Sequence, residues 1–201
     1  MSLKPILFNT EMVKAELDGI KRCTRRVVKG YIPKDAQFGY TAFTPKGYIS
    51  CRGIFEDGYG EKFFKLPYQK GDILYIRETW SEWTGGYLYK AWTEPFPQPG
   101  LFPGIKWSPS IHMPRDAARI WLKVTDVRVE RLQDIDINGI RSEGLGSAAV
   151  HAGDMDIALK EWEILWNSTI DKSNIDTYGW EANPFVWVVE FERCERPESE
   201  K

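Results

Sequence analysis

The pattern of hydrophobic and polar positions predicts five β-strands spread along the chain. They cover residues 4–8, 23–28, 73–80, 119–131 and 184–192. In the last of these, every second residue is large and apolar and shares one face: Phe185, Trp187, Val189 and Phe191. In 119–131 the alternation shifts by one residue near Thr125 and Asp126, which predicts a β-bulge at that point.

Three segments have a helical period instead. In 11–18, Val13, Leu17 and Ile20 recur at i, i+4 and i+7, and Gly19 is a typical helix stop. Asn9 or Thr10 is expected to cap this helix. A short helix is predicted within 132–144 and a stronger one over 156–167, where four apolar residues follow helical spacing. These are Met155, Leu159, Trp162 and Trp166.

Two stretches, at about 29–70 and 81–113, have no sustained period and are interpreted as insertions. The first contains turn signals at Pro45-Lys-Gly47 and Asp57-Gly58, which indicate a β-meander or a long ordered insertion. The second is predicted to hold a strand over 87–92, followed by a loop with five prolines between Pro95 and Pro109.

Strands outnumber helices and do not alternate regularly with them, which argues against a doubly wound sheet. The expected fold class is α+β: a small mixed β-barrel with a few peripheral helices and two long insertions. We expect residues 1–201 to form one domain, because this length suits a single hydrophobic core.

The formal net charge of -2 excludes a generally basic nucleic-acid-binding surface, so such binding requires a local patch. Residues 21–29 form a basic block, whereas 130–143 and 154–163 are mostly acidic. No apolar run is long enough to span a bilayer and no signal peptide is evident, so we expect a cytoplasmic protein with no membrane partner. Three cysteines and two histidines without short spacings predict reduced thiols and no metal site.

The most unusual local chemistry follows Gly19. Four of the next seven residues are cationic: Lys21, Arg22, Arg25 and Arg26. Such a concentration of like charge is costly unless a carboxylate or a polyanion meets it. The pattern therefore indicates a partner, either within the chain or outside it.

These segments resemble the ASCH domains of the PUA-like superfamily. The resemblance lies in Gly19-x-Lys21-x-x-Thr24-x-Arg26, in Gly71-Asp72-Ile-Leu, in the run from Leu132 to Glu143-Gly144 and in the terminal Val186-Trp-Val-Val-Glu-Phe191. It covers the framework of the chain but not the insertions. It is closest to longer bacterial and prophage-encoded members, in which stretches like Arg77-Glu78-Thr79-Trp80 and Ser110-Ile-His-Met-Pro-Arg115 also occur.

The resemblance implies a β-barrel with a cleft for RNA or a modified nucleoside, and no cofactor. One compact branch of the family is an amidohydrolase that removes the acetyl group from acetylcytidine with a lysine, a threonine and a glutamate. Carried over by motif, these are Lys21, Thr24 and Glu143. Amide hydrolysis needs an activated oxygen nucleophile, a base and oxyanion donors. Thr24 is expected to supply a hydroxyl or orient water, and Glu143 to position Lys21 and relay a proton to the leaving amine.

Strand alternation places Lys21 and Thr24 on opposite sides, so the proposed triad requires a turn or bulge between them. Arg26 or Arg77 is a candidate for oxyanion or phosphate binding. The full set of candidate substrate or nucleic-acid contacts is Arg22, Arg25, Arg26, Arg77, Glu78, Trp80, Trp107, His112 and Arg115. Trp162, Trp166 and Trp187 are interpreted as core residues.

Several functions remain open from the sequence. The first is a small hydrolase acting on an acylated nucleobase such as acetylcytidine. The second is a non-catalytic module that binds RNA or a modified base in the same cleft by charge and stacking. A ribonuclease is a third, which the lack of a histidine pair or a metal-binding carboxylate cluster makes less attractive. In a purely structural interpretation, Lys21 and Glu143 are an ion pair on the barrel rim.

Overall fold

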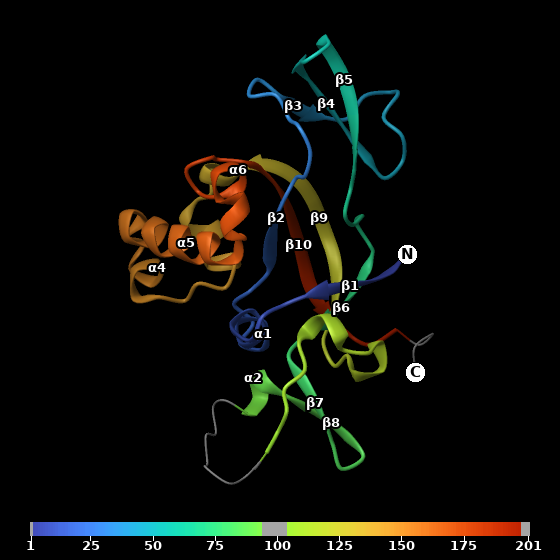
Figure 1. The fold of residues 1–201 in the computed structure, drawn as a ribbon, viewed down its shortest axis with the longest axis vertical. Coiled ribbons are helices and arrows are strands. Elements are labelled where there is room, and N and C mark those ends of the chain that lie inside the picture. The colour runs from blue at the N-terminus through green and yellow to red at the C-terminus, as the bar shows by residue number, and fades with distance from the viewer. Residues whose placement is uncertain (1, 94–103, 198–201) are drawn as a thin grey trace.

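The computed structural model describes residues 2–93 and 104–197 and is built around one five-stranded sheet (Figure 1). The strand order is β1-β6-β9-β10-β2. The bounds are β1 Leu3–Leu7, β6 Ile73–Arg77, β9 Trp121–Arg131, β10 Phe185–Cys194 and β2 Cys23–Val27. β1 and β6 are parallel, and the other neighbours are antiparallel. Mixed sheets with several helices confirm the predicted α+β class.

Strand pairing does not close this sheet into a complete β-barrel within the described residues. β1 and β2 are its two edges, and no strand pairing joins them among the described residues. One side chain bridges the edges instead: Arg26 Nη2 of β2 donates to the carbonyl oxygen of Leu7 in β1 at 2.8 Å. The sheet is therefore open.

The N-terminal helix forms as its pattern predicts. It is α1 (Thr10–Leu17), and the Asn9 side chain accepts a hydrogen bond from Met12 N at 2.8 Å. Gly19 follows with φ +71°, a conformation that glycine adopts without steric cost. The buried face differs in part from the prediction, because Val13, Ala15 and Glu16 are buried while Leu17 is only half-buried.

The hairpin of β9 and β10 confirms both the alternation and the bulge. The register shifts so that Glu190 pairs with Asp126 and Phe191 pairs with Val124, which leaves Thr125 unpaired. Trp187, Val189 and Phe191 pack in the core on one face of the sheet. Val186 and Val188 pack in a second core on the other face.

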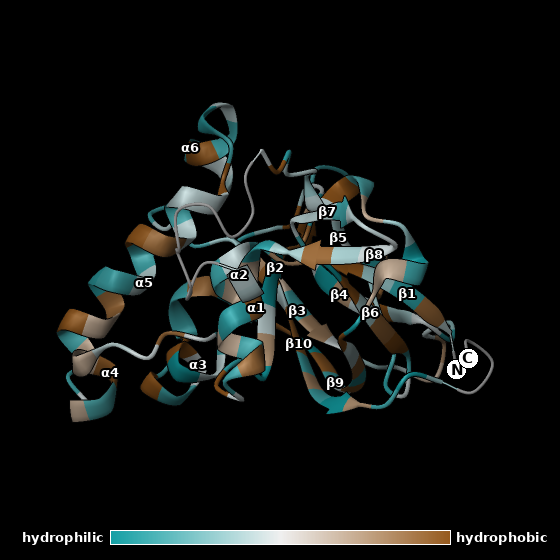
Figure 2. Cartoon of the chain, turned by 90° about the horizontal axis from the view of Figure 1, so that it is seen from below, coloured by the Kyte–Doolittle hydropathy of each residue, from teal (hydrophilic) through white to brown (hydrophobic). Residues whose placement is uncertain are grey.

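The second core is covered by helices on one side of the sheet (Figures 1 and 2). They are α3 (Ile137–Ser142), α4 (Ala148–Ala152), α5 (Met155–Thr169) and the short α6 (Ile175–Tyr178). The predicted helix over 132–144 is split into a 3₁₀ turn, Leu132–Asp134, and α3. The split arises because Asp136 caps a new helix by accepting from Gly139 N at 2.7 Å.

The first insertion is an antiparallel meander, as predicted. It contains β3 (Gln37–Gly39), β4 (Tyr48–Phe55) and β5 (Gly58–Lys65), which we call the wing. The wing lies at the top of Figure 1, and its inner face contributes Ile49, with Phe38 and Phe64 packed beside it, to the core that includes Trp187.

The second insertion lies at the opposite end of the molecule (Figure 1). The strand predicted over 73–80 ends at Arg77, and β7 (Trp80–Trp83) pairs with β8 (Gly86–Tyr89). The strand predicted over 87–92 is wrong in its second half, because Lys90–Thr93 is a helical turn, α2. Two 3₁₀ turns, Ser110–His112 and Arg115–Ala117, lead into β9. Most of the predicted proline-rich loop lies outside the described residues.

Candidate functional site

Lys21 and Glu143 meet in a buried ion pair although 122 residues separate them in sequence. Lys21 Nζ donates to Glu143 Oε2 at 2.9 Å and to the Glu143 carbonyl oxygen at 2.7 Å. Only 2% of Lys21 and 5% of Glu143 are exposed. Taking both charges out of water is costly, so their hydrogen bonds must offset a desolvation penalty of several kcal/mol per ion.

Local backbone geometry brings the pair together. After Gly19 the chain turns from α1 into β2, and Arg22 N donates to the Ser142 carbonyl oxygen at the end of α3 at 2.7 Å. Glu143 caps α3, and Gly144 follows with φ +105°. A Cβ atom at Gly144 would lie 2.8 Å from Ala15 Cβ and 3.4 Å from Lys21 Cβ. The absence of a side chain at 144 therefore lets α3 approach α1 closely enough for the pair to form.

We expect Gly144→Ala to lower the free energy of unfolding by about 3 kcal/mol, through the cost of a left-handed residue plus overpacking against Ala15. Gly153→Ala is the matched control, because Gly153 also has positive φ (+76°) but its Cβ would meet nothing within 4 Å. Urea unfolding of both variants should show that the free energy of unfolding falls by only about 1 kcal/mol in the control. Equal losses in the two variants would show that the packing of Gly144 against Ala15 leaves room for a Cβ atom.

The side chains of Arg25 and Phe8 also contact the Lys21–Glu143 pair. Arg25 Nη1 donates to Glu143 Oε1 at 3.2 Å, and Arg25 Nη2 donates to Glu130 Oε2 at 3.3 Å. On the other side, the Phe8 ring lies 5.4 Å from Lys21 Nζ, within the range of a cation–π contact. The Glu143 carboxylate is therefore held by two cations, one bonded to each oxygen.

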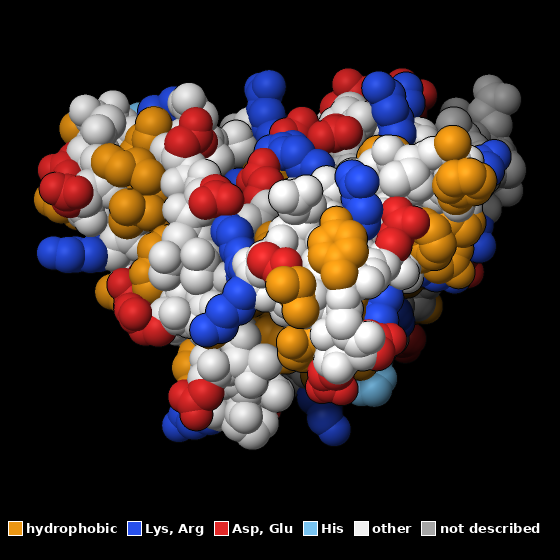
Figure 3. Space-filling view, turned by 90° about the horizontal axis from the view of Figure 1, so that it is seen from above, with side chains coloured by type: hydrophobic (Ala, Val, Ile, Leu, Met, Phe, Trp, Pro, Cys, Tyr) orange, Lys and Arg blue, Asp and Glu red, His pale blue; other side chains and the backbone are white. Residues whose placement is uncertain are grey.

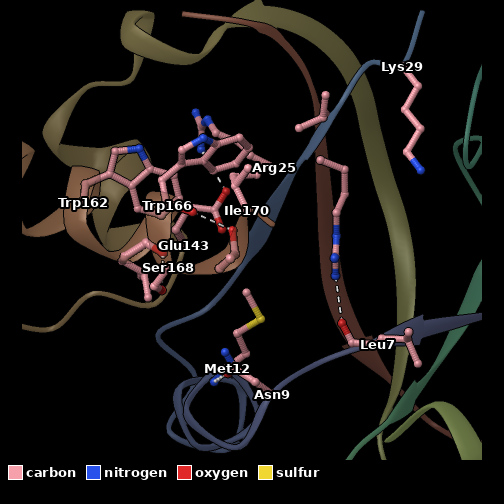
Figure 4. A pocket seen from close by; sticks show the side chains of 14 residues that line it. Leu7, Asn9, Met12, Arg25, Lys29, Glu143, Trp162, Trp166, Ser168 and Ile170 are labelled. Atoms are coloured by element: carbon pink, nitrogen blue, oxygen red, sulfur yellow. Dashed lines mark hydrogen bonds and ion pairs between the residues drawn. The ribbon is translucent and has the colours of Figure 1, made fainter. Parts of the chain in front are cut away.

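A cleft of about 630 Å³ opens beside Glu143, where β2 faces α5 and the first turn of α1 (Figure 4). Glu143 and Arg25 contribute the charged groups nearest to α5. Trp162 and Trp166 supply an aromatic wall, with ring centroids 6.1 Å apart. A cavity with this volume and a few polar groups among apolar walls is typical of a small-molecule site.

Thr24 does not join the pair through a hydrogen bond. It lies in β2 opposite Val189 of β10, only 1% of it is exposed, and its Oγ1 has no partner among the described residues. Strand alternation explains this position, since Cys23 packs in the helix-side core while Val28, which shares the Thr24 side, packs in the opposite one. The catalytic role of Thr24 stays a prediction.

The three arginines in and just before β2 lie in different surroundings. Arg25 and Arg26 line the cleft. Arg22 is exposed and lines a separate small cavity that also reaches Lys21. Of the three arginines, Arg26 therefore combines partial exposure with a position on the cleft wall.

The other candidate contacts lie in the second insertion or beside it, and none lines the cleft. Arg77 Nε donates to the Met113 carbonyl oxygen at 2.7 Å, and Glu78 accepts two hydrogen bonds from Arg119, at 2.8 and 3.0 Å. Trp80 is 7% exposed and packs in a third core with Met113. Its role as a substrate or nucleic-acid contact stays a prediction. Trp107 is half-buried, and His112 and Arg115 are exposed at the two 3₁₀ turns.

Sequence reasoning missed two features of the site. Trp162 and Trp166 were assigned to the core, and they are buried there, but they also border the cleft. Their i, i+4 spacing is the same for a core stripe and for a cleft wall, so the pattern alone does not separate the two. The other feature is Glu16, a carboxylate with only 5% of its surface exposed on the buried side of α1.

Burial controls the ionisation of two groups near the pair. It raises the pKa of the Cys23 thiol to about 12, with the Glu143 charge adding to the effect, so Cys23 is a neutral thiol at pH 7 and no nucleophile. Burial also raises the pKa of Glu16 to about 7, although Arg193, Lys21 and Arg22 act in the opposite direction.

The raised pKa of Glu16 predicts a pH-dependent stability. The folded state binds the proton of Glu16 more tightly than the unfolded chain, whose ordinary value is 4.5, so stability falls as pH rises from about 4.5 to about 7. The loss is up to about 3 kcal/mol. We expect Glu16→Gln to unfold at a higher temperature than wild type at pH 8 and at a similar temperature at pH 4. The same difference in unfolding temperature between the two proteins at every pH would contradict this.

Within residues 2–93 and 104–197, no helix is long and apolar enough to cross a membrane. The same residues contain no group of three or more histidine, cysteine, aspartate or glutamate side chains placed to hold a metal ion.

Comparison with known proteins gave one match. No family model and no curated protein sequence matched the chain. Among solved structures, an ASCH domain from Lactobacillus crispatus JV V101 matched 96% of this chain and 79% of its own, with a TM-score of 0.41 and 11% sequence identity. A function for this chain must therefore be argued from its own residues and contacts.

Proposed function

We propose that this protein binds a modified nucleoside, free or within RNA, in the cleft beside Glu143 and hydrolyses an N-acyl group such as that of acetylcytidine. The observation that supports it most is the buried Lys21–Glu143 pair, whose glutamate lines a cleft of about 630 Å³. Both residues occupy the positions that the ASCH motif gives to the lysine and the glutamate of an acetylcytidine amidohydrolase.

The arrangement suits amide hydrolysis. The reaction adds water to the acetyl carbonyl carbon, breaks the bond from that carbon to the base nitrogen, and returns a proton to that nitrogen. Glu143 faces the cleft and is placed to take the proton of the attacking water. Lys21 and Arg25 hold the two carboxylate oxygens, which fixes the direction of the carboxylate. Arg25, which lines the cleft, is the cation placed to stabilise the oxyanion.

Substrate binding is assigned to the walls of the cleft. Trp162 and Trp166 border the cleft, and because each is only 3% exposed, a base bound there would contact a small part of either ring. Arg26 and Lys29 lie on the β2 side of the cleft, where their positive charge suits a phosphate if the substrate is a nucleotide of RNA.

The test is a proton NMR time course of acetylcytidine with the wild-type protein at pH 7. The proposal predicts a growing acetate signal and the appearance of cytidine. Saturation transfer to acetylcytidine without any acetate would show a binding protein instead, and neither signal would remove acetylcytidine as a ligand.

The first insertion, residues 29–70, contains the wing and favours a second candidate function: a non-catalytic module for single-stranded RNA. Residues 29–70 carry seven lysines and arginines against four aspartates and glutamates, a net charge of +3 in a chain of net charge -2. Five aromatic side chains of this region are strongly exposed: Tyr31, Tyr40, Phe43, Tyr59 and Phe63. Figure 3 views the molecule from the wing side and shows hydrophobic side chains beside Lys and Arg on that face. Exposed rings beside cations are the elements of sequence-tolerant binding to single strands.

Binding of a labelled oligouridine tests this second function. We expect the double change Tyr59→Ala and Phe63→Ala to weaken it if the wing carries RNA, whereas Tyr87→Ala, an exposed tyrosine outside the wing, should leave it unchanged. Equal binding by both variants would exclude the wing as the RNA-binding surface.

A further inference from the structure

A second, smaller cavity reaches Lys21 without passing through the cleft. It has a volume of about 310 Å³, and we call it the Lys21 cavity. Its charged lining consists of Glu16, Lys21, Arg22, Glu192 and Arg193. The cleft is lined by Glu143 and the Lys21 cavity by Lys21, so the ion pair separates the two spaces.

Glu16 is the unexplained group in this cavity. Its carboxylate is on the buried side of α1, and its Oε2 has no hydrogen-bond partner among the described residues. A buried carboxylate oxygen without a partner is costly and is seldom kept in a folded protein without a reason. Val13 and Ala15, the other buried residues of α1, are apolar.

The charges around Glu16 come from two segments. Lys21 and Arg22 face it from the turn before β2, and Arg193 and Glu192 face it from β10. Glu16 interacts electrostatically with Lys21, Arg22 and Arg193, yet burial outweighs all three and raises the pKa of its carboxyl to about 7. Near neutral pH it therefore exchanges between a neutral and a negative form, and each exchange changes the field at Lys21.

We propose that Glu16 is a positioning residue for Lys21: by exchanging a proton with solvent through the Lys21 cavity, it sets the charge around the Lys21–Glu143 pair from the side away from the substrate. In its negative form Glu16 adds a second carboxylate near the ammonium group, and in its neutral form Glu143 alone balances Lys21. The consequence for hydrolysis rests on the proposed function, whereas the effect on Lys21 does not.

The direct test follows the Cε signal of Lys21 by NMR in protein labelled with ¹³C-lysine, titrated from pH 5 to pH 9. Lys21→Arg identifies the signal by its loss. We expect an inflection near neutral pH in wild type and its loss in Glu16→Gln. Glu11→Gln is the matched control, because Glu11 is an exposed glutamate of the same helix, and it should keep the inflection. Persistence of the inflection in Glu16→Gln would overturn the proposal.

A second readout separates this inference from the proposed function. If acetylcytidine is hydrolysed, the rate of wild type should change with pH near neutrality and that change should be lost in Glu16→Gln. If no acetate forms but the inflection is present and depends on Glu16, the hydrolase proposal fails and the positioning of Lys21 stands. If acetate forms with the same pH profile in both proteins, the role of Glu16 fails and the hydrolase proposal stands.

Discussion

Replacing Glu143 by glutamine is expected to lower the free energy of unfolding by about 3 to 5 kcal/mol, the usual cost of removing one partner from a buried ion pair. The loss is large here because one carboxylate serves two cations. Lys21 Nζ lies 2.9 Å from Oε2 and Arg25 Nη1 lies 3.2 Å from Oε1, and both cations are almost fully buried. A neutral amide leaves Lys21 without a counter-charge and Arg25 with Glu130 as its remaining carboxylate, in a medium where unpaired charge is expensive.

A double variant separates charge from packing in this result. Lys21→Met with Glu143→Leu removes both charges, and pairs of this kind can be replaced by apolar residues at little cost. Urea unfolding should therefore show most of the stability restored in the double variant, with Arg25 still paired to Glu130. If the double variant is as unstable as Glu143→Gln, the loss comes from packing and not from unpaired charge.

Replacing Lys21 by arginine is expected to lower the rate of acetate release at least about 100-fold, the lower range for a general base that is no longer held in place. Arginine keeps the positive charge, but its guanidinium does not fit the contacts of a compact ammonium group, so the Glu143 carboxylate loses its orientation. The Lys21 ammonium donates to both the carboxylate and the carbonyl oxygen of Glu143, a geometry that depends on its size.

Nucleoside binding provides the control for Lys21→Arg. Because Lys21 does not line the cleft, the affinity measured by titration calorimetry should change much less than the rate. Undiminished acetate release by Lys21→Arg would show that a fixed positive charge beside Glu143 is sufficient, and would contradict the need for the compact ammonium group of Lys21.

The strands and helices were predictable where burial imposes a simple period. Val186 and Val188 face one core while Trp187 and Val189 face the other, and this period of two is visible in the sequence. The bulge at Thr125 was predictable for the same reason, because it shifts this period by one residue. The open sheet was not predictable. Whether β1 and β2 pair depends on the tertiary arrangement, and the sequence pattern of either strand is the same in both cases.

The site was less accessible to sequence reasoning than the fold. The 122-residue separation of Lys21 and Glu143 has no local signal, and only the motif resemblance suggested their pairing. Glu16 was missed because a charged residue on an amphipathic helix is ordinarily expected to face solvent. The sequence places Arg77 and Glu78 among the candidate contacts, and in the structure they bond to the Met113 carbonyl and to Arg119, close to the two ends of the second insertion.

The most direct test of the central claim is the initial rate of acetate release from acetylcytidine at pH 7, measured for wild type and for the double variant Lys21→Met with Glu143→Leu. The account predicts steady release by wild type and none above the spontaneous rate by the double variant, although both proteins are folded. Equal rates from the two proteins, or no release by wild type, would contradict the assignment of the Lys21–Glu143 pair as the reaction centre.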